Sequence, residues 1–139
     1  MAVVTMYIQL ASRGEGDVMD ITGKVQTCVE EAGLSRGVVT IFVSGSTGAV
    51  TTMEYEPGLV KDLPEMLERV VPRDRAYAHQ ETWNDDNGHS HVKASLIGPS
   101  LVVPFVDGKL TLGVWQQIVF LELDIHPRNR RIVLQVTGE

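Results

Sequence analysis

Hydrophobic and polar positions alternate in short runs at the start of the chain, a pattern typical of β-strands. Val3–Leu10 is rich in β-branched and aromatic residues and predicts a first strand. The glycine-containing segment Arg13–Gly16 ends this run. Asp17–Ile21 predicts a second, short strand.

Apolar residues then recur at the spacing of an amphipathic helix. This helix is expected between Thr22, a candidate N-cap, and Gly33, a candidate C-terminal stop. Its apolar stripe consists of Val25, Cys28, Val29 and Ala32. We interpret Cys28 as a core residue rather than a nucleophile, because free cysteines are commonly buried.

The middle of the chain predicts two more strands followed by a helix. The strands are expected at Gly37–Ser44 and Ala49–Tyr55, joined by the small polar turn Gly45–Gly48. Pro57–Val71 has helical spacing, but Pro64 interrupts it. We therefore expect a short helical turn and then a new helix start near Pro64.

The second half of the chain predicts a polar loop, a short helix and several strands. The expected segments are a loop over Pro72–Asn87, a short helix after His91, a hairpin of Leu101–Val106 and Lys109–Leu112 around Asp107-Gly108, a long strand Val114–Leu123, a basic turn Pro127–Arg131 and a last strand Arg131–Thr137. This order predicts an α+β fold with mainly antiparallel sheets.

Composition and charge narrow the function classes. The 139 residues suit a single domain, residues 1–139. A net charge of −6 argues against nucleic acid as a partner, because that binding rests on phosphate neutralisation. No apolar run is long enough for a membrane span, and the N-terminus lacks the pattern of a signal peptide. We therefore expect a cytoplasmic protein, and its single cysteine cannot form an internal disulfide.

Three histidines, His79, His89 and His91, fall close together and suggest a metal site, because imidazole is a common metal ligand. The acidic residues of the same region are Glu81, Asp85 and Asp86. The side chains of His89 and His91 point in the same direction only if this segment is extended. To bind one metal ion together, both residues would therefore have to precede the helix. The alternative to a metal site is a polar loop exposed to solvent. The fourth histidine, His126, is interpreted as an ordinary turn residue.

Three polar groups could bind a ligand or serve the structure alone. Gly45–Gly48 can present backbone N–H groups to an anion, although an ordinary turn explains it as well. Arg128, Arg130 and Arg131 suit either phosphate capture or a solvated turn. Gln116-Gln117 inside an apolar run suits a structural hydrogen-bond network or a substrate contact.

Short motifs from Asp20 onward match one known family in type and order. They are Asp20-Ile21-Thr22, Ser46–Val50 with Glu54, Glu56-Pro57, Asp62-Leu63, Tyr77 with His79, Asn87–Leu101, Val103-Pro104, Gly108–Leu110, Leu112-Gly113, Trp115–Gln117, Asp124, Pro127-Arg128 and Arg130-Arg131. On these motifs the chain resembles the YjbQ family of small proteins. The resemblance implies an α+β fold of two packed sheets, a homotrimer and a metal-centred site built from a histidine cluster.

The activity that this resemblance implies is a secondary thiamine-phosphate synthase, in which a hydroxymethylpyrimidine diphosphate joins a thiazole phosphate with loss of diphosphate. On this hypothesis the small phosphorylated ligand is held by Ser46, Thr47, Lys93 and Arg130. His89, His91 and Glu54 orient a divalent metal, zinc or magnesium, or polar groups of the substrate. Gln116 orients the ring substrate. The two histidines are the expected metal ligands.

One departure from the family pattern favours a second hypothesis. Gly45 stands where the family usually has a histidine, and Met53 stands where it usually has an asparagine before Glu54. A trihistidine centre therefore cannot form from the matched positions. The alternative is a non-enzymatic trimeric protein that binds a ligand or metal through a degenerate site.

Overall fold

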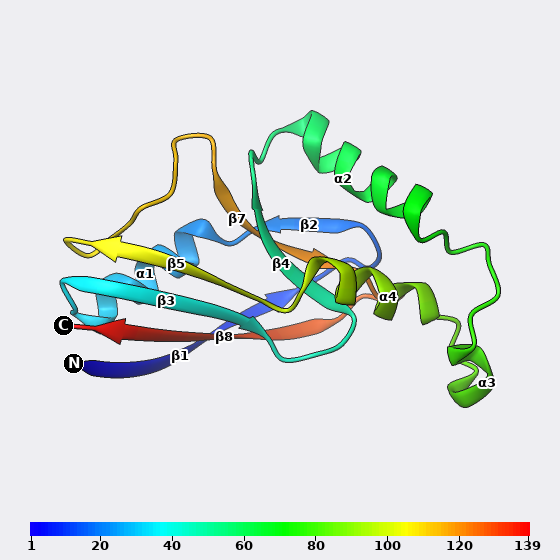
Figure 1. Ribbon diagram of the computed structural model, residues 1–139, viewed down its shortest axis with the longest axis horizontal. Coiled ribbons are helices and arrows are strands. Elements are labelled where there is room, and N and C mark those ends of the chain that lie inside the picture. The colour runs from blue at the N-terminus through cyan, green and yellow to red at the C-terminus, as the bar shows by residue number, and fades with distance from the viewer.

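Two antiparallel sheets and four helices make up the computed structural model, which describes residues 1–139 (Figure 1). The strands are β1 (Ala2–Ala11), β2 (Asp17–Asp20), β3 (Arg36–Val43), β4 (Gly48–Met53), β5 (Ser100–Val106), β6 (Lys109–Leu110), β7 (Gln117–Glu122) and β8 (Asn129–Gly138). The helices are α1 (Thr22–Ala32), α2 (Pro57–Val70), α3 (His79–Trp83) and α4 (Gly88–Ile97). The predicted α+β class with antiparallel sheets is confirmed.

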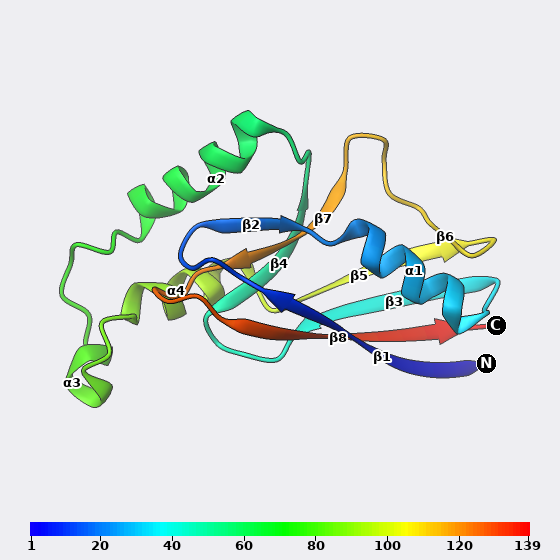
Figure 2. The ribbon, with the colours of Figure 1, turned by 180° about the vertical axis from the view of Figure 1, so that it is seen from behind.

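The two sheets differ in size and in what covers them. The larger has the strand order β1-β8-β3-β5-β6 and the smaller has the order β2-β7-β4. Figure 2 shows α1 lying against the larger sheet from behind, while α2 and α4 lie beyond the smaller sheet. The small sheet therefore contributes to two cores, one on each face.

The side chains of β7 alternate between the two cores. Ile118 and Phe120 belong to the main core between the larger sheet, α1 and the small sheet. Val119 and Leu121 point the other way, into a smaller core with Leu67 of α2. All four are buried because both faces of β7 are covered. None of the four helices has the length and apolar character of a membrane-spanning segment.

The start of α1 differs from the expected N-cap. Thr22 is the first helical residue, and the preceding Ile21 takes the N-cap position without a side-chain hydrogen bond. The hydroxyl of Thr22 instead donates to Asp20 Oδ1 over 2.7 Å and accepts the N–H of Ile118 over 2.8 Å. Thr22 thus links α1 to β7 rather than capping the helix. The predicted end at Gly33, which adopts a left-handed conformation, is confirmed.

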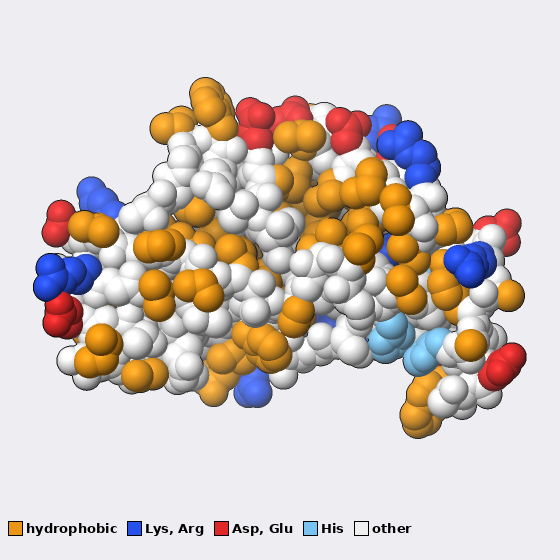
Figure 3. Space-filling model, viewed as in Figure 1, with side chains coloured by type: hydrophobic (Ala, Val, Ile, Leu, Met, Phe, Trp, Pro, Cys, Tyr) orange, Lys and Arg blue, Asp and Glu red, His pale blue; other side chains and the backbone are white.

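Helix α2 is continuous, so the predicted break at Pro64 is wrong. Pro57 stands in its first turn, and the carboxylate of Glu56 accepts the N–H groups of Gly58 and Leu59. This capping begins the helix well before Pro64. Hydrophobic side chains gather between α2 and α4 (Figure 3). Only Leu67 of α2 is fully buried, so the helix lies on the small sheet through a narrow apolar contact.

The segment expected to be a loop up to Asn87 contains the short helix α3, and α4 begins earlier than predicted. Both His89 and His91 lie inside α4. Residues two apart on a helix point about 200° apart, so the two imidazoles diverge. The extended geometry required for a shared ion is absent.

The C-terminal strands follow the predicted order with shorter bounds. The hairpin around Asp107-Gly108 is present, and both turn residues have positive φ, as a tight hairpin turn requires. The long strand expected from Val114 begins only at Gln117, and Trp115 is exposed. β7 and β8 are both interior strands with a neighbour on each side. The apolar residues of β7 and most of those of β8 are covered within the chain.

Candidate functional site

A polar cleft of about 430 Å³ lies where three connections meet at one end of the sheets. They are the β3–β4 loop, the region of α3 and α4, and the β7–β8 loop. The charged and imidazole side chains that line it are His79, Asp85, His91, Asp124, Arg128, Arg130 and Arg131. In this cleft Arg128 is paired with Asp124 and Arg130 with the buried Glu122, while the guanidinium of Arg131 lies over the ring of Tyr7. We call it the Arg130 cleft.

A buried network of charges forms the floor of the Arg130 cleft. Arg130 donates from Nε and Nη2 to the two carboxylate oxygens of Glu122, over 2.9 and 2.5 Å. Its Nη2 also donates to the hydroxyl of Thr47 over 2.9 Å, and this hydroxyl donates to Asp124 Oδ2. Ser12 donates to Glu122 over 2.7 Å. The paired charges satisfy one another and hold the guanidinium in one orientation.

One edge of the Arg130 guanidinium remains free and faces the β3–β4 loop. Its Nη1 makes no hydrogen bond to a protein acceptor, and a Cβ placed on Gly45 would come within 2.9 Å of it. The backbone N–H groups of Gly45, Ser46 and Thr47 also donate to no protein acceptor. These donors line the cleft together. Free N–H groups beside a fixed guanidinium form a suitable surface for an oxyanion.

A pair of histidines closes the other side of the Arg130 cleft. The rings of His79 and His91 lie 4.4 Å apart between centroids, and His79 Nε2 lies 3.3 Å from Asp85 Oδ1. Figure 3 shows histidine side chains at the surface near α4 and α3. Burial and, secondarily, the adjacent His79 lower the pKa of His91. His91 is therefore neutral at pH 7 and can accept a hydrogen bond from a ligand.

Asp124 connects the histidine side of the cleft to its floor. It accepts hydrogen bonds from Thr47 and from Asn87, the latter over 3.3 Å, and pairs with Arg128 Nε at 2.8 Å. Burial alone would raise its pKa. The Ile125 N–H, the Thr47 hydroxyl, the Asn87 amide and the Arg128 charge outweigh burial, so the pKa of Asp124 is lowered. Asp124 stays ionised and fixes Arg128 at the rim.

The structure brings together four of the predicted site residues and separates the others. Ser46, Thr47, His91 and Arg130 line the Arg130 cleft. His89 and Lys93 lie on another side of α4, where Glu15 Oε1 is 2.6 Å from His89 Nε2 and 3.7 Å from Lys93 Nζ. The sequence spacing did not show that His91 and His89 lie on different sides of α4, because the side on which each residue lies depends on the exact start of the helix.

Glu54 and Gln116 lie outside the cleft. Glu54 is exposed just after β4, at the end of the strand opposite the β3–β4 loop. Gln116 is exposed in the turn before β7, where it donates to Thr52 Oγ1 and accepts the N–H of Gly113. Gln117 accepts the N–H of Tyr55. Both glutamines therefore take part in local structural networks, which is one of the two interpretations left open by the sequence.

The donor set of the single chain does not fit the metal ion that the family resemblance implies. His89 and His91 diverge on α4, and no group of three His, Cys, Asp or Glu side chains is arranged to hold an ion. Near His91 the structure provides one imidazole neighbour, His79, whose Nε2 contacts Asp85. We therefore derive no chemical step through a metal.

Two buried carboxylates are functional candidates that sequence reasoning missed. Glu122 and Asp124 are 0% and 1% exposed, and they organise both Arg128 and Arg130. A signal was present in the sequence, because Glu122 interrupts the apolar run of β7. A buried carboxylate requires a cationic partner. The arginine cluster that follows β7 could therefore have been predicted to supply the partner of Glu122.

Comparisons with known proteins give one family over nearly the whole chain. The family described as "UPF0047 protein YjbQ-like" matches residues 6–139. A UPF0047 protein of Methanothermobacter thermautotrophicus is 40% identical over 139 residues, which cover 100% of this chain and 95% of that protein. The UPF0047 protein YugU of Bacillus subtilis is 31% identical over 96% of this chain and 98% of its own.

Solved structures agree with this relationship. A YbjQ-like protein of unknown function from Sulfolobus solfataricus is 31% identical, with a TM-score of 0.89 over 99% of this chain and 100% of its own. A hypothetical protein from Aeropyrum pernix is 33% identical, with a TM-score of 0.87 over the whole of both chains. Sequence and fold thus agree from end to end. This chain belongs to the YjbQ (UPF0047) family.

Proposed function

We propose that the Arg130 cleft binds the phosphate group of a small phosphorylated molecule. The observation that carries this proposal is the free edge of Arg130, whose Nη1 lies beside Gly45 in a loop where the N–H groups of Gly45, Ser46 and Thr47 are unpaired. Glu122 holds the guanidinium in place before the ligand arrives, so little side-chain entropy is lost on binding. Arg128 at the rim adds a second charge.

The reaction that fits this site is the transfer implied by the family resemblance. The bond between the pyrimidine's methylene carbon and its diphosphate oxygen breaks, and that carbon forms a bond to the thiazole nitrogen. Negative charge develops on the leaving diphosphate, where the N–H groups of the β3–β4 loop and the two arginines would stabilise it. Neutral His91 would accept a hydrogen bond from the pyrimidine. Thr47 acts through Arg130 and Asp124, because its hydroxyl is already bonded to both.

Binding and turnover can be tested separately. Titration of the protein with inorganic diphosphate should show one site, and Arg128→Ala should weaken it about 10- to 100-fold, as expected for one charge-assisted hydrogen bond. Lys61→Ala removes one exposed positive charge from α2 and serves as the matched control. Equal affinity of the Arg128→Ala and Lys61→Ala variants would contradict the proposed site. Thiamine phosphate formed from the two substrates, and lost in His91→Ala, would support the reaction.

A second candidate function is ligand binding without catalysis. It is favoured by the floor of the cleft, where the Thr47 hydroxyl and two nitrogens of Arg130 are already committed to Glu122 and Asp124. These groups cannot turn to follow a departing diphosphate without leaving a buried carboxylate unpaired. Tight diphosphate binding with no thiamine phosphate above background would select this function over the transferase.

The proposed assembly is a homotrimer, supported by the outer face of the larger sheet. Exposed apolar side chains on this face come from three strands. They are Val3 and Tyr7 of β1, Val38 and Phe42 of β3, and Val102 and Val106 of β5. The strand pairing places Tyr7, Val133 and Phe42 in one row across the sheet. An apolar face of this kind favours association with other copies, and a monomer mass by light scattering at micromolar concentration would contradict the trimer.

A further inference from the structure

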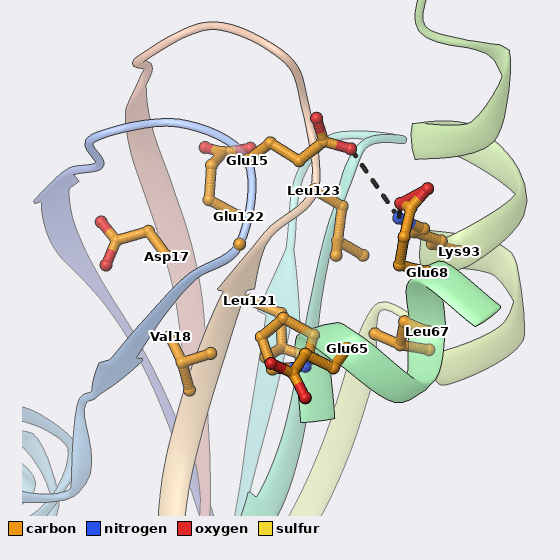
Figure 4. A pocket seen from close by; sticks show the side chains of 12 residues that line it. Glu15, Asp17, Val18, Glu65, Leu67, Glu68, Lys93, Leu121, Glu122 and Leu123 are labelled. Carbon is orange, nitrogen blue, oxygen red and sulfur yellow. Dashed lines mark hydrogen bonds and ion pairs between the residues drawn. The ribbon is translucent and has the colours of Figure 1, made fainter. Parts of the chain in front are cut away.

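A loop glutamate occupies a cationic pocket on the side of α4 that faces away from the Arg130 cleft. Glu15 extends from the β1–β2 loop toward Lys93 (Figure 4). Its Oε1 lies 2.6 Å from His89 Nε2 and 3.7 Å from Lys93 Nζ, and its Oε2 lies 3.1 Å from Arg73 Nη1. His89 and Lys93 are 1% and 4% exposed. Three side chains that can carry positive charge thus converge on one carboxylate.

An apolar cavity adjoins this carboxylate. It has a volume of about 250 Å³ and lies between α2 and the small sheet. Its apolar walls are Val18, Pro64, Leu67, Leu121 and Leu123. The cavity is also lined by acidic residues, namely Glu15, Asp17, Glu65, Glu68 and Glu122. Glu68 is paired with Lys93, Asp17 with Arg13 and Glu122 with Arg130, while Glu65 makes no ion pair. The cavity therefore joins an apolar wall to Lys93, the cation that lines it and also contacts Glu15.

Glu15 lies in a loop between two glycines. Its neighbours Gly14 and Gly16 have φ of 123° and 85°, a region that favours glycine. The side chain of Glu15 is 22% exposed, so it can move into solvent without opening the core. After that movement Lys93 keeps Glu68 and Arg73 keeps Asp86. His89 loses its only carboxylate partner, so its Nε2 is left without a hydrogen-bond partner.

We propose that Arg73, His89 and Lys93 form a second ligand site, occupied by Glu15 in this structure, which accepts a short aliphatic carboxylic acid. The ligand's carboxylate replaces that of Glu15, and its hydrocarbon chain lies along Leu67 and Leu121. A carboxylate is the chemistry already bound there, and the adjoining cavity is apolar. This site is independent of the function proposed for the Arg130 cleft.

The test is a titration of the full-length Glu15→Ala variant with acetate, butyrate and hexanoate at pH 7. Binding is measured by calorimetry and by NMR chemical-shift changes. Each methylene buried against the apolar wall should tighten binding about three- to fourfold, so butyrate should bind about tenfold more tightly than acetate. Wild-type protein should follow the same order with at least about tenfold weaker affinity, because Glu15 must first leave. Glu15→Gln keeps the volume, removes the charge and provides the same test if Glu15→Ala does not fold.

Three variants in the Glu15→Ala background decide between this site and nonspecific binding. Lys93→Met should abolish butyrate binding, whereas Lys61→Ala, which removes one exposed positive charge from α2 outside the cavity, should leave it unchanged. Arg128→Ala should also leave it unchanged, which separates this site from the Arg130 cleft. Equal affinities for acetate and hexanoate, or butyrate binding that survives Lys93→Met, would overturn the proposal.

Discussion

Replacement of Arg130 by Met removes one partner of a buried ion pair while keeping most of the side chain's volume. Arg130 is 7% exposed and Glu122 is 0% exposed, and two hydrogen bonds join them. The variant leaves the carboxylate of Glu122 with Ser12 as its remaining side-chain donor. Breaking a buried pair in this way costs about 3–5 kcal/mol, because an uncompensated charge stays in the protein interior.

This loss is large relative to the free energy of unfolding of a domain, which is about 5–15 kcal/mol. For a chain of this size, 1 kcal/mol corresponds to about 3.4 °C, so Tm should fall by about 10–17 °C. Urea unfolding followed by circular dichroism, at one fixed protein concentration, measures the free energy directly. Fixed concentration matters because assembly contributes to the apparent stability.

A double variant tests the physical reason for the loss. Arg130→Met combined with Glu122→Leu removes both charges, so it should recover at least half of the stability lost in Arg130→Met alone. A loss below about 1 kcal/mol for Arg130→Met would show that the pair is not needed for the fold. A double variant as unstable as the sum of both single variants would refute the role of the unpaired charge.

Three other predictions concern the cleft and α2. Because the pKa of Asp124 is lowered in the folded protein, its charge stabilises the fold at pH values above the unfolded pKa near 3.8. This stabilisation disappears as the pH falls through the lower pKa of the folded state. Acid unfolding should therefore depend less steeply on pH in Asp124→Asn than in the wild type. The pKa of His91 should lie below 6.5 in an NMR titration and should rise in His79→Gln, because the electrostatic effect of His79 that lowers this pKa is removed. Pro64→Ala should raise the free energy of unfolding by about 1–3 kcal/mol, since it restores an N–H that can donate to the carbonyl of Val60, and an unchanged urea midpoint would count against this reasoning.

The sequence by itself determined most of the secondary structure and the fold class. Alternation and β-branched residues located the strands, and Asp107-Gly108 marked the hairpin turn that the structure contains. These signals are local, because the period of the side chains and the φ values of a turn depend on residues close in the chain. The family resemblance was also readable from short motifs in order, and the comparisons confirm it.

The errors at the level of elements also have local causes. Pro64 indicates a helix break, yet the cap at Glu56 begins α2 upstream and the helix runs through the proline. Thr22 is a typical N-cap residue, but its hydroxyl bonds to Ile118 of β7 instead. In both cases an interaction that the local propensity does not include determined the outcome.

The tertiary structure alone decided which polar residues share a site. His89 and His91 are two residues apart, but the turn of α4 sends one toward Glu15 and the other toward His79. Arg130 and Thr47 are far apart in sequence and meet across the end of the sheets. The direction of a side chain depends on the exact helix start and on strand register, which are set by packing across the two cores. The chain's sequence therefore specified its elements and family, while the site arose only from how those elements pack.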